Sequence, residues 1–232
     1  MPATFDIPGR DDVRLLVTDR HDGDFSPMHV HPDRLESSRR VVVDLPWTQL
    51  REDHGTNVVL VRHPGQHDGA DGDALLTDVP HAVLGVWAGD CAPVCLVGDS
   101  WVGVVHAGWR GLRDGVVEAA CHAFRERGDV VHHAVIGPRI GPCCYEFGEN
   151  DLDVMADRFG QGIRSHDRRG MPALDVSECV SAAVAIAAGS DVAVRDLGIC
   201  TGCDDRFFSH RTRGESGRHV MAVWIEPVGV SS

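Results

Sequence analysis

Two histidines and one cysteine in this sequence have the residue types of a metal site. His54 lies on a turn that enters an apolar run, Cys91 lies just past another, and His106 ends a third, directly before a glycine-rich turn. Imidazole and thiolate are preferred zinc ligands, and three protein ligands leave a fourth position open, as in catalytic zinc sites. The separations of 37 and 15 residues match no compact zinc module. A buried thiol with two unrelated histidines is therefore the alternative.

The turn after His106 has the composition of an anion site. Its sequence, AGWRGL, contains two glycines and Arg110 and leads from an apolar run into an expected helix. Free N–H groups at a helix start attract anions, and an arginine offers two parallel donors to a phosphate or carboxylate. A tight connection with a solvent-exposed arginine is the alternative. Because a candidate metal ligand lies next to it, we favour the anion site.

Short apolar runs separated by Gly, Pro and Asp predict a protein with more strands than helices. Two segments have helical patterns, Leu112–Arg127 and Val176–Ala188, each closed by a glycine, and a weaker one lies at 149–159. Asp175 or Ser177 is a candidate cap for the second. Several strands follow one another directly, which favours an α+β fold with mixed sheets over a regular βαβ repeat. The expected strands lie at 12–19, 41–45, 57–63, 81–89, 100–108, 130–137, 191–198 and 219–227.

Composition excludes several classes of function. All 22 basic residues are arginine, so a Schiff-base lysine, a pyridoxal-phosphate lysine and a Walker-type phosphate lysine are ruled out. Asp and Glu total 35 and the net charge is -13, which argues against a surface for nucleic acid or anionic lipid. No apolar run is long enough to span a membrane and the start is not a signal peptide, so we expect a cytoplasmic protein.

The length of 232 residues suits a single domain over 1–232. Residues 20–40 are polar, a composition typical of a mobile surface segment or a lid. Eight cysteines in a chain of this size, with no signal peptide, indicate reduced thiols rather than a disulfide framework. Cys200 and Cys203 are spaced for a second zinc or a redox pair. Because no partner Cys-x-x-Cys exists, we interpret them as structural or as lining a pocket.

Four segments together resemble one known family. They are GDCAPVCLV, VVHAGWRGL, IGPRIGPCCYEFGE and CTGCDDRFFSHRTRGESGRHVMAVWI. They are similar to the YfiH-like family, also called the laccase-domain or polyphenol-oxidoreductase family, and the resemblance runs from about His54 to Ile225. It implies one domain with mixed sheets sandwiched between helices. It also implies a zinc site made by His54, Cys91 and His106, the same three residues that their types suggest.

The resemblance implies an enzyme of purine nucleosides rather than a laccase. Members are associated with phosphorolysis of adenosine, inosine, guanosine and methylthioadenosine, and with deamination of adenosine. A multicopper laccase needs several His-x-His pairs, and this chain has one, His29 and His31, outside the matching region. We therefore expect Zn²⁺, with copper as the alternative that the family name suggests. Two other functions stay open: an amidase-like hydrolase that edits peptidoglycan precursors, with Cys91 and His106 as a nucleophile and base if no metal binds, and a non-catalytic metal-binding protein.

The same resemblance suggests roles for further residues. Proton transfer in deamination needs a carboxylate, and phosphorolysis needs a phosphate cradle together with a surface for the base. The alternatives are a turn cap for each aspartate, a surface ion pair for each arginine and a core edge for the tyrosine. The candidate proton carriers are Asp73 and Asp90, the candidate phosphate ligands are Arg110, Arg139 and Arg211, and the candidate contact for the base is Tyr145, the only tyrosine.

The chain departs from the family pattern beside its first expected ligand. Glu52 and Asp53 precede His54 where the family usually has Gln-Val. Two carboxylates there would make the site more negative, which would strengthen metal binding or repel an anionic co-substrate such as phosphate.

Overall fold

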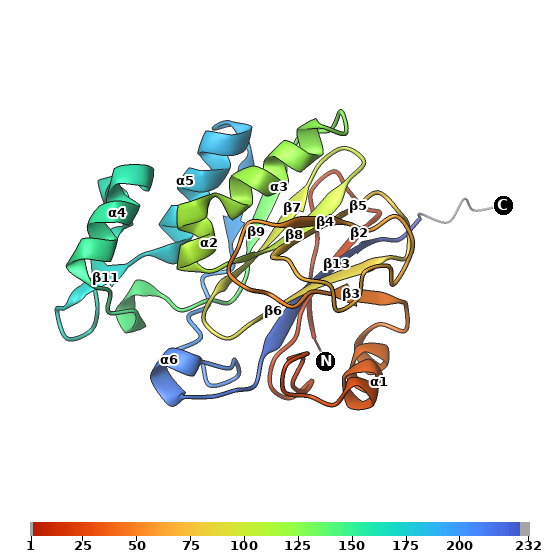
Figure 1. The fold of residues 1–232 in the computed structure, drawn as a ribbon, viewed down its shortest axis with the longest axis horizontal. Helices are drawn as coiled ribbons and strands as arrows, with labels where there is room; N and C mark the ends of the chain where they lie inside the picture. The colour runs from red at the N-terminus through yellow and green to blue at the C-terminus, as the bar shows by residue number, and fades with distance from the viewer. Residues whose placement is uncertain (1, 228–232) are drawn as a thin grey trace.

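In the computed structural model, which describes residues 2–227, two mixed sheets pack face to face with helices on both outer sides (Figure 1). The five-stranded sheet has the order β1-β2-β13-β6-β3 and the six-stranded sheet has the order β12-β9-β7-β8-β5-β4. The first comprises β1 (Ala3–Phe5), β2 (Val13–Val17), β13 (His219–Ile225), β6 (Val83–Ala88) and β3 (Trp47–Gln49). The second comprises β12 (Ala193–Asp196), β9 (His133–Ile136), β7 (Ala92–Val97), β8 (Val102–Ala107), β5 (Ala74–Thr77) and β4 (Val58–Leu60).

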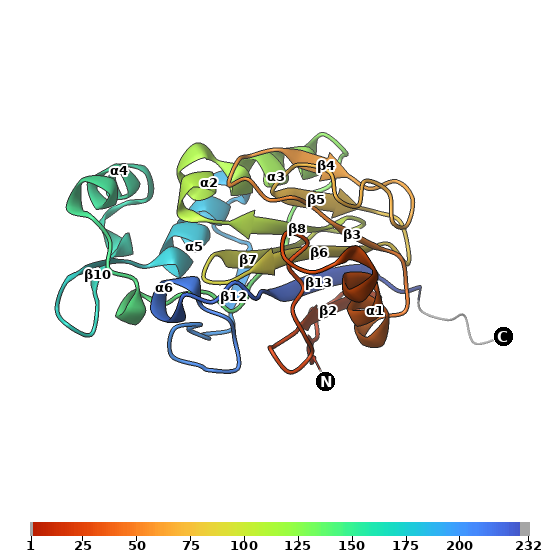
Figure 2. The ribbon, with the colours of Figure 1, turned by 60° about the horizontal axis from the view of Figure 1, so that its bottom comes forward.

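Helices cover the outer face of each sheet (Figure 2). Against the six-stranded sheet lie α2 (Trp109–Asp114), α3 (Val116–Arg125) and α5 (Val176–Ala188), and α4 (Glu149–Phe159) packs beside α5. Helix α1 (Pro32–Val42) lies against the five-stranded sheet. The remaining elements are the 3-10 helices η1 (Pro142–Cys144) and η2 (Gln161–Ile163), the hairpin of β10 (Arg164–His166) and β11 (Pro172–Leu174), and α6 (His210–Arg213). Among the described helices, none is both long and apolar enough to cross a bilayer.

The central strands are buried on both faces, which explains their nearly continuous apolar sequences. In β7, Val94 and Leu96 face the helices, whereas Cys95 and Val97 face the five-stranded sheet. Three layers of core result: one between helices and the six-stranded sheet, one between the sheets, and a smaller one beneath α1. The expectation of an α+β fold with mixed sheets between helices is confirmed.

Several boundaries differ from the sequence prediction. The expected helix Leu112–Arg127 is two helices, because Gly115 adopts φ 99° and ends α2 while starting α3. The strand expected at 41–45 is wrong, since Val41 and Val42 form the last turn of α1. Helix α1 also contains much of the polar segment 20–40 that we expected as a mobile stretch or lid. Helix α5 begins as predicted, with the Asp175 carboxylate accepting the Ser177 and Glu178 N–H groups.

A single aspartate holds the turn that joins β7 to β8. The Asp129 carboxylate accepts N–H groups from Asp99, Ser100, Trp101 and Val130 at 2.7–2.9 Å. Burial raises the pKa of Asp129, but these four donors lower it more, so the net shift is downward. The ionised side chain therefore fixes the far end of β7, which follows Cys91, and of β8, which carries His106.

We expect Asp129→Asn to lower the free energy of unfolding by about 2 kcal/mol, because an amide nitrogen would face backbone N–H groups that now donate to a charged oxygen. In a chain of this length that corresponds to a fall of roughly 4–8 °C in Tm. Thermal and urea denaturation measure the change. Asp44→Asn, at an exposed carboxylate after α1, is the matched control. Equal effects of the two substitutions would contradict this role.

His219 is a buried histidine of β13 with one polar contact. Its Nε2 lies 3.3 Å from the Pro138 carbonyl oxygen, its Nδ1 has no partner among the described residues, and its ring meets that of Phe207 edge-on. Burial lowers the pKa of His219 to about 4, although the Pro138 carbonyl opposes the shift. The folded protein therefore takes up this proton at lower pH than the unfolded chain does.

This shift makes stability depend on pH with a definite sign. Above the unfolded pKa of about 6.5 the histidine is neutral in both states, and below it only the unfolded chain gains a proton. We expect wild-type protein to lose about 3 kcal/mol more than His219→Gln between pH 6.5 and 4. Urea denaturation across this range measures the difference. The control is His29→Gln, at an exposed site. If the difference in unfolding free energy between wild type and His219→Gln does not change with pH, the assignment is refuted.

Candidate active site

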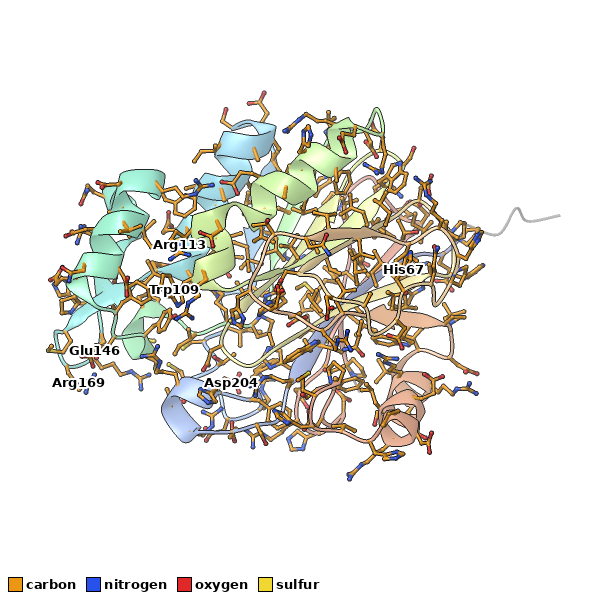
Figure 3. The ribbon with its side chains drawn as sticks, in the orientation of Figure 1. His67, Trp109, Arg113, Glu146, Arg169 and Asp204 are labelled. Atoms are coloured by element: carbon orange, nitrogen blue, oxygen red, sulfur yellow. The ribbon has the colours of Figure 1, made fainter. Side chains whose placement is uncertain are left out.

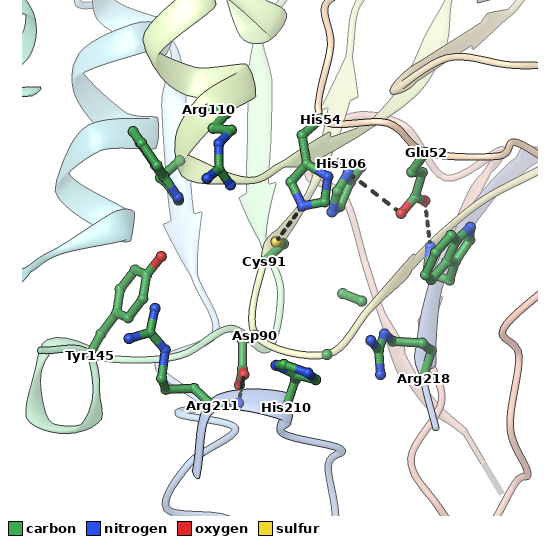
Figure 4. Close-up of a pocket in the computed structure, with 14 residues that line it drawn as sticks. Glu52, His54, Asp90, Cys91, His106, Arg110, Tyr145, His210, Arg211 and Arg218 are labelled. Carbon is green, nitrogen blue, oxygen red and sulfur yellow. Dashed lines mark hydrogen bonds and ion pairs between the residues drawn. The ribbon is translucent and has the colours of Figure 1, made fainter. Parts of the chain in front are cut away.

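The three predicted metal ligands converge at one end of the paired sheets (Figure 4). His54 lies on the turn between β3 and β4, Cys91 on the connection by which the chain crosses from β6 to β7, and His106 near the end of β8. Their ligand atoms all lie within 4.8 Å of one another, with 3.7 Å between Cys91 Sγ and His54 Nε2. The two imidazole rings are nearly perpendicular, with centroids 4.9 Å apart.

Asp73 holds both histidines in place by hydrogen bonds. It is fully buried, and its carboxylate accepts the His54 and Gly55 backbone N–H groups at 3.0 and 2.8 Å. His106 Nδ1 lies 2.8 Å from Asp73 Oδ1, which leaves His106 Nε2 as the nitrogen available to an ion. Burial raises the pKa of Asp73, but the hydrogen bonds from His106 and Gly55 help to lower it, to about 2. The backbone of His54 has φ 65°, so these bonds hold a turn that few residues adopt.

The same arrangement favours a thiolate at Cys91. Burial raises the pKa of this thiol, but the opposite effect of His106 and His54 is larger, so the pKa falls to about 6. For His106, burial lowers the pKa, whereas Glu52, Cys91 and Asp73 raise it well above its ordinary value. One thiolate and two imidazoles, one of them fixed by a carboxylate, form a donor set that suits a single zinc ion.

The site is compact enough to require a glycine beside it. A Cβ on Gly108 would lie 2.6 Å from His54 Cδ2 and 3.2 Å from Cys91 Sγ. The glycine therefore allows the backbone after β8 to pass directly against the His54 ring, between the strand that carries His106 and the start of α2.

A cavity of about 410 Å³ opens beside Cys91 (Figure 4). Its residues come from the metal-ligand turns, the start of α2, the segment after η1, and the chain around α6. The side chains that line it are Glu52, His54, Trp87, Ala88, Asp90, Cys91, His106, Trp109, Arg110, Tyr145, His210, Arg211 and Arg218, together with Gly89. This volume suits a small ligand.

Three arginines line this cavity, and none of them pairs with a carboxylate of residues 2–227: Arg110, Arg211 and Arg218. The guanidinium of Arg110 lies 4.6 Å from the centre of the Trp109 ring. Arg113 contacts the same ring (Figure 3) but is paired with Asp114. In a chain with net charge -13, most arginines pair with acids, so three without a carboxylate partner at one cavity mark a place for an anion.

The other residues predicted from the sequence lie in different places. Asp90 lines the cavity, but both its oxygens are occupied: Oδ1 accepts hydroxyls of Thr201 and Ser209 at 2.7 Å, and Oδ2 accepts the backbone N–H of Arg211 at 2.6 Å. Tyr145 also lines it, with the Arg211 guanidinium 4.9 Å from its ring centre.

Two predicted residues do not line the cavity. Asp73 lies behind the histidines. Arg139 is buried and bonds with Ser177 and Asp196.

The Glu52 side chain is buried beside His106. Its carboxyl is buried, Oε1 accepts the Trp87 N–H at 2.9 Å, and Oε2 lacks a hydrogen-bond partner in the described chain while lying 3.5 Å from His106 Nδ1. Burial raises the pKa of Glu52 to about 8. Burial therefore favours the protonated form of Glu52, whereas the neighbouring His106 favours its carboxylate.

Sequence reasoning missed several residues of the cavity. Trp87 lies within the strand that we expected at 81–89, and Trp109 and Arg218 lie within motifs that we noted for other residues. His210 lines the cavity without belonging to the metal-ligand cluster. The sequence does not show that these residues share one cavity, because the contact of α6 with the β6–β7 connection, made through Asp90, is tertiary.

Comparison with known proteins identifies the family. A family model described as multi-copper polyphenol oxidoreductase laccase matches residues 16–226. The chain belongs to this family. A purine nucleoside phosphorylase of Xylella fastidiosa is 36% identical over 185 residues, covering 76% of this chain and 71% of that protein. A purine nucleoside phosphorylase of Haemophilus influenzae is 30% identical over 210 residues, covering 83% and 82%.

Solved structures show the same fold. The crystal structure of YlmD from Geobacillus stearothermophilus matches with a TM-score of 0.83 and 24% identity, over 95% of this chain and 94% of that one. A YfiH protein of Bacillus licheniformis matches equally well, with a TM-score of 0.83 over 97% of each chain. The resemblance to the YfiH-like family is thereby confirmed, and the laccase-type description applies to the family rather than to a demonstrated reaction.

We expect Gly108→Ala to weaken binding of Zn²⁺ at His54, Cys91 and His106 by at least roughly tenfold, because the new methyl group would displace the His54 ring. Competition with a chromophoric chelator measures the affinity. Gly148→Ala is the matched control, since a Cβ there meets no atom within 4 Å and its φ is -66°. Unchanged zinc affinity in Gly108→Ala would contradict this packing.

Proposed function

We propose that this chain is a purine nucleoside phosphorylase, which cleaves a nucleoside with inorganic phosphate. The observation that carries the proposal is the set of three arginines, Arg110, Arg211 and Arg218, that line the cavity beside Cys91 and lack carboxylate partners within residues 2–227. The names of the relatives in Xylella fastidiosa and Haemophilus influenzae support the same reaction.

In this reaction the glycosidic C1′–N bond of the nucleoside breaks and a bond forms between C1′ and a phosphate oxygen. The products are a ribose 1-phosphate and the free base, which takes up the proton that hydrogen phosphate loses on becoming the ester. Arg110 and Arg211 would bind and orient the phosphate dianion by paired N–H donors. The flat rings of Trp87, Trp109 and Tyr145 offer apolar surface to the purine.

We propose that His54, Cys91 and His106 hold one zinc ion at the floor of the cavity. Their donor set, with Asp73 fixing the His106 tautomer, fits a zinc ion that keeps a fourth position open. A zinc ion there would supply Lewis acidity to a substrate atom. The protein's own contribution is to hold the ligands, to present Arg110 to the phosphate and to keep the Tyr145 hydroxyl protonated, since burial raises its pKa.

Adenosine deamination is a second candidate function of the same cavity. It is favoured by one observation, the unpartnered Glu52 Oε2 that lies 3.5 Å from His106 Nδ1. A carboxyl at that place could transfer protons between water and the exocyclic amine. Asp90 is a weaker candidate for this role than the sequence suggests, because its oxygens already accept three hydrogen bonds.

A single assay separates the two functions. Zinc-loaded protein is incubated with adenosine, with and without phosphate, and the products are separated by chromatography. We expect adenine only when phosphate is present; inosine in either condition would indicate deamination. Absence of product from adenosine, inosine and guanosine at full zinc occupancy would refute both, and a peptidoglycan precursor would then be tested for release of its amino acid.

The phosphate site is tested by Arg110→Gln. We expect the KM for phosphate to rise by roughly tenfold or more, since one charge-assisted pair of hydrogen bonds would be lost, while the KM for nucleoside changes little. Arg62→Gln is the matched control, an exposed arginine remote from the cavity whose side chain makes no ion pair within residues 2–227. A rise confined to the nucleoside KM would place the phosphate elsewhere.

A further inference from the structure

A second group of possible metal ligands lies outside the cluster of His54, Cys91 and His106. The sulfur atoms of Cys143, Cys144, Cys200 and Cys203 all lie within 4.8 Å of one another. The first pair ends the 3-10 helix η1, and the second pair lies on the turn that follows β12. The Cys-x-x-Cys pair, which has no counterpart of its own spacing in the sequence, thus meets a pair of adjacent cysteines far away in the chain.

The spacing of the sulfur atoms is that of ligands around one ion. Cys143 Sγ lies 3.3 Å from Cys203 Sγ, 3.7 Å from Cys200 Sγ and 3.8 Å from Cys144 Sγ, and Cys144 Sγ lies 3.5 Å from Cys203 Sγ. Four thiolates at about 2.3 Å from a tetrahedral zinc ion lie about 3.8 Å from one another. A disulfide would require a sulfur separation of about 2.05 Å. An iron–sulfur cluster would spread its cysteines around several atoms, whereas these leave space for a single ion.

Neighbouring groups support thiolates at these positions. The Gly141 N–H donates to Cys200 Sγ at 3.1 Å, and the Arg168 guanidinium donates to Cys203 Sγ at 2.9 Å. Both donors favour a negative sulfur, as the surroundings of metal-bound thiolates generally do. Thiol groups with no ion would gain less from a guanidinium, which binds an anion best.

Two glycines, Gly141 and Gly202, allow the two cysteine segments to approach each other closely. A Cβ on Gly202 would lie 2.8 Å from Cys144 Cβ and 3.0 Å from its sulfur, and one on Gly141 would lie 3.3 Å from Cys200 Sγ. Glycine at both positions lets each loop approach the cysteines of the other. An isolated parallel bridge between Arg139 and Cys200 fixes the same register.

We propose that Cys143, Cys144, Cys200 and Cys203 bind a structural zinc ion, distinct from the one proposed for the cavity. Four protein thiolates close the coordination shell, which is the arrangement of structural rather than catalytic zinc. Soft thiolate ligands in a tetrahedral set select zinc over magnesium, calcium or manganese. The proposal is independent of the reaction proposed above.

The position of the cluster indicates what the ion would stabilise. Tyr145 directly follows Cys144, and the chain from Cys203 leads into α6, which carries His210 and Arg211. These two segments form one wall of the cavity, where the Arg211 guanidinium lies over the Tyr145 ring. An ion bound by Cys143, Cys144, Cys200 and Cys203 would link these two segments and so stabilise this wall of the cavity.

Metal analysis of protein purified in reducing buffer without chelators tests the proposal. We expect about two zinc ions per chain in wild type, about one in Cys200→Ser/Cys203→Ser, and about one in His54→Ala/His106→Ala, each loss being specific to its site. Cys121→Ser, at a buried cysteine of α3 outside both clusters, is the matched control and should keep both ions. A wild-type protein with one zinc, lost in His54→Ala/His106→Ala and kept in the cysteine variant, would overturn the proposal.

Cobalt provides a readout that does not depend on the folding of the cysteine variant. In His54→Ala/His106→Ala reconstituted with Co²⁺, we expect one equivalent to bind with the intense thiolate charge-transfer absorption and visible bands of a tetrahedral four-sulfur site. Weak, octahedral-type absorption would overturn the proposal. So would alkylation under denaturing conditions, with chelator and no reductant, that modifies fewer than eight cysteines, because the missing thiols would be in disulfides.

Discussion

The geometry of the candidate active site depends on the carboxylate of Asp73. Fully buried at the start of β5, it accepts N–H groups from His54, from Gly55 and from the His106 ring. A buried carboxylate is stable only when such donors compensate its desolvation, so the turn with His54 and the end of β8 must keep their positions relative to β5. The hydrogen bond to His106 Nδ1 also leaves Nε2 as the nitrogen available to a metal ion. Asp73 therefore both stabilises the fold and orients a candidate metal ligand.

The two-sheet architecture supplies the third ligand. The chain leaves the five-stranded sheet at the end of β6 and enters the six-stranded sheet at β7, and Cys91 lies on that short connection. Asp90, with φ 103°, turns the connection and accepts hydroxyl and N–H donors from Thr201, Ser209 and Arg211. The crossing between sheets is therefore joined to the C-terminal segment, and residues more than a hundred positions apart meet around one cavity.

Sequence alone was informative where local pattern determines structure. Apolar runs and caps predicted the α+β fold and helix α5, capped by one of its two candidates, Asp175. Ligand types suggested the histidine–cysteine cluster, and the family resemblance implied the same three residues. It failed where tertiary contacts decide: β7 was not distinguished as a strand, and Val41 and Val42 entered a helix despite their β propensity. The buried state of Glu52 could not be predicted, and the spacing of Cys200 and Cys203 did not show that Cys143 and Cys144 lie beside them.

The charge distribution connects the composition to the cavity. A lysine-free chain with 35 acidic residues uses arginine for most of its ion pairs, and many of these lie at the surface, as does the pair of Glu146 with Arg169 of the β10–β11 hairpin. Around the cavity the carboxyl groups are engaged elsewhere: burial raises the pKa of Glu52, Asp73 accepts N–H donors, and Asp90 accepts three hydrogen bonds. The arginines there are thus left to attract an anion, although the protein as a whole repels anions. The phosphate site that we propose rests on these three arginines, which have no carboxylate partner among residues 2–227, rather than on the net charge of the chain.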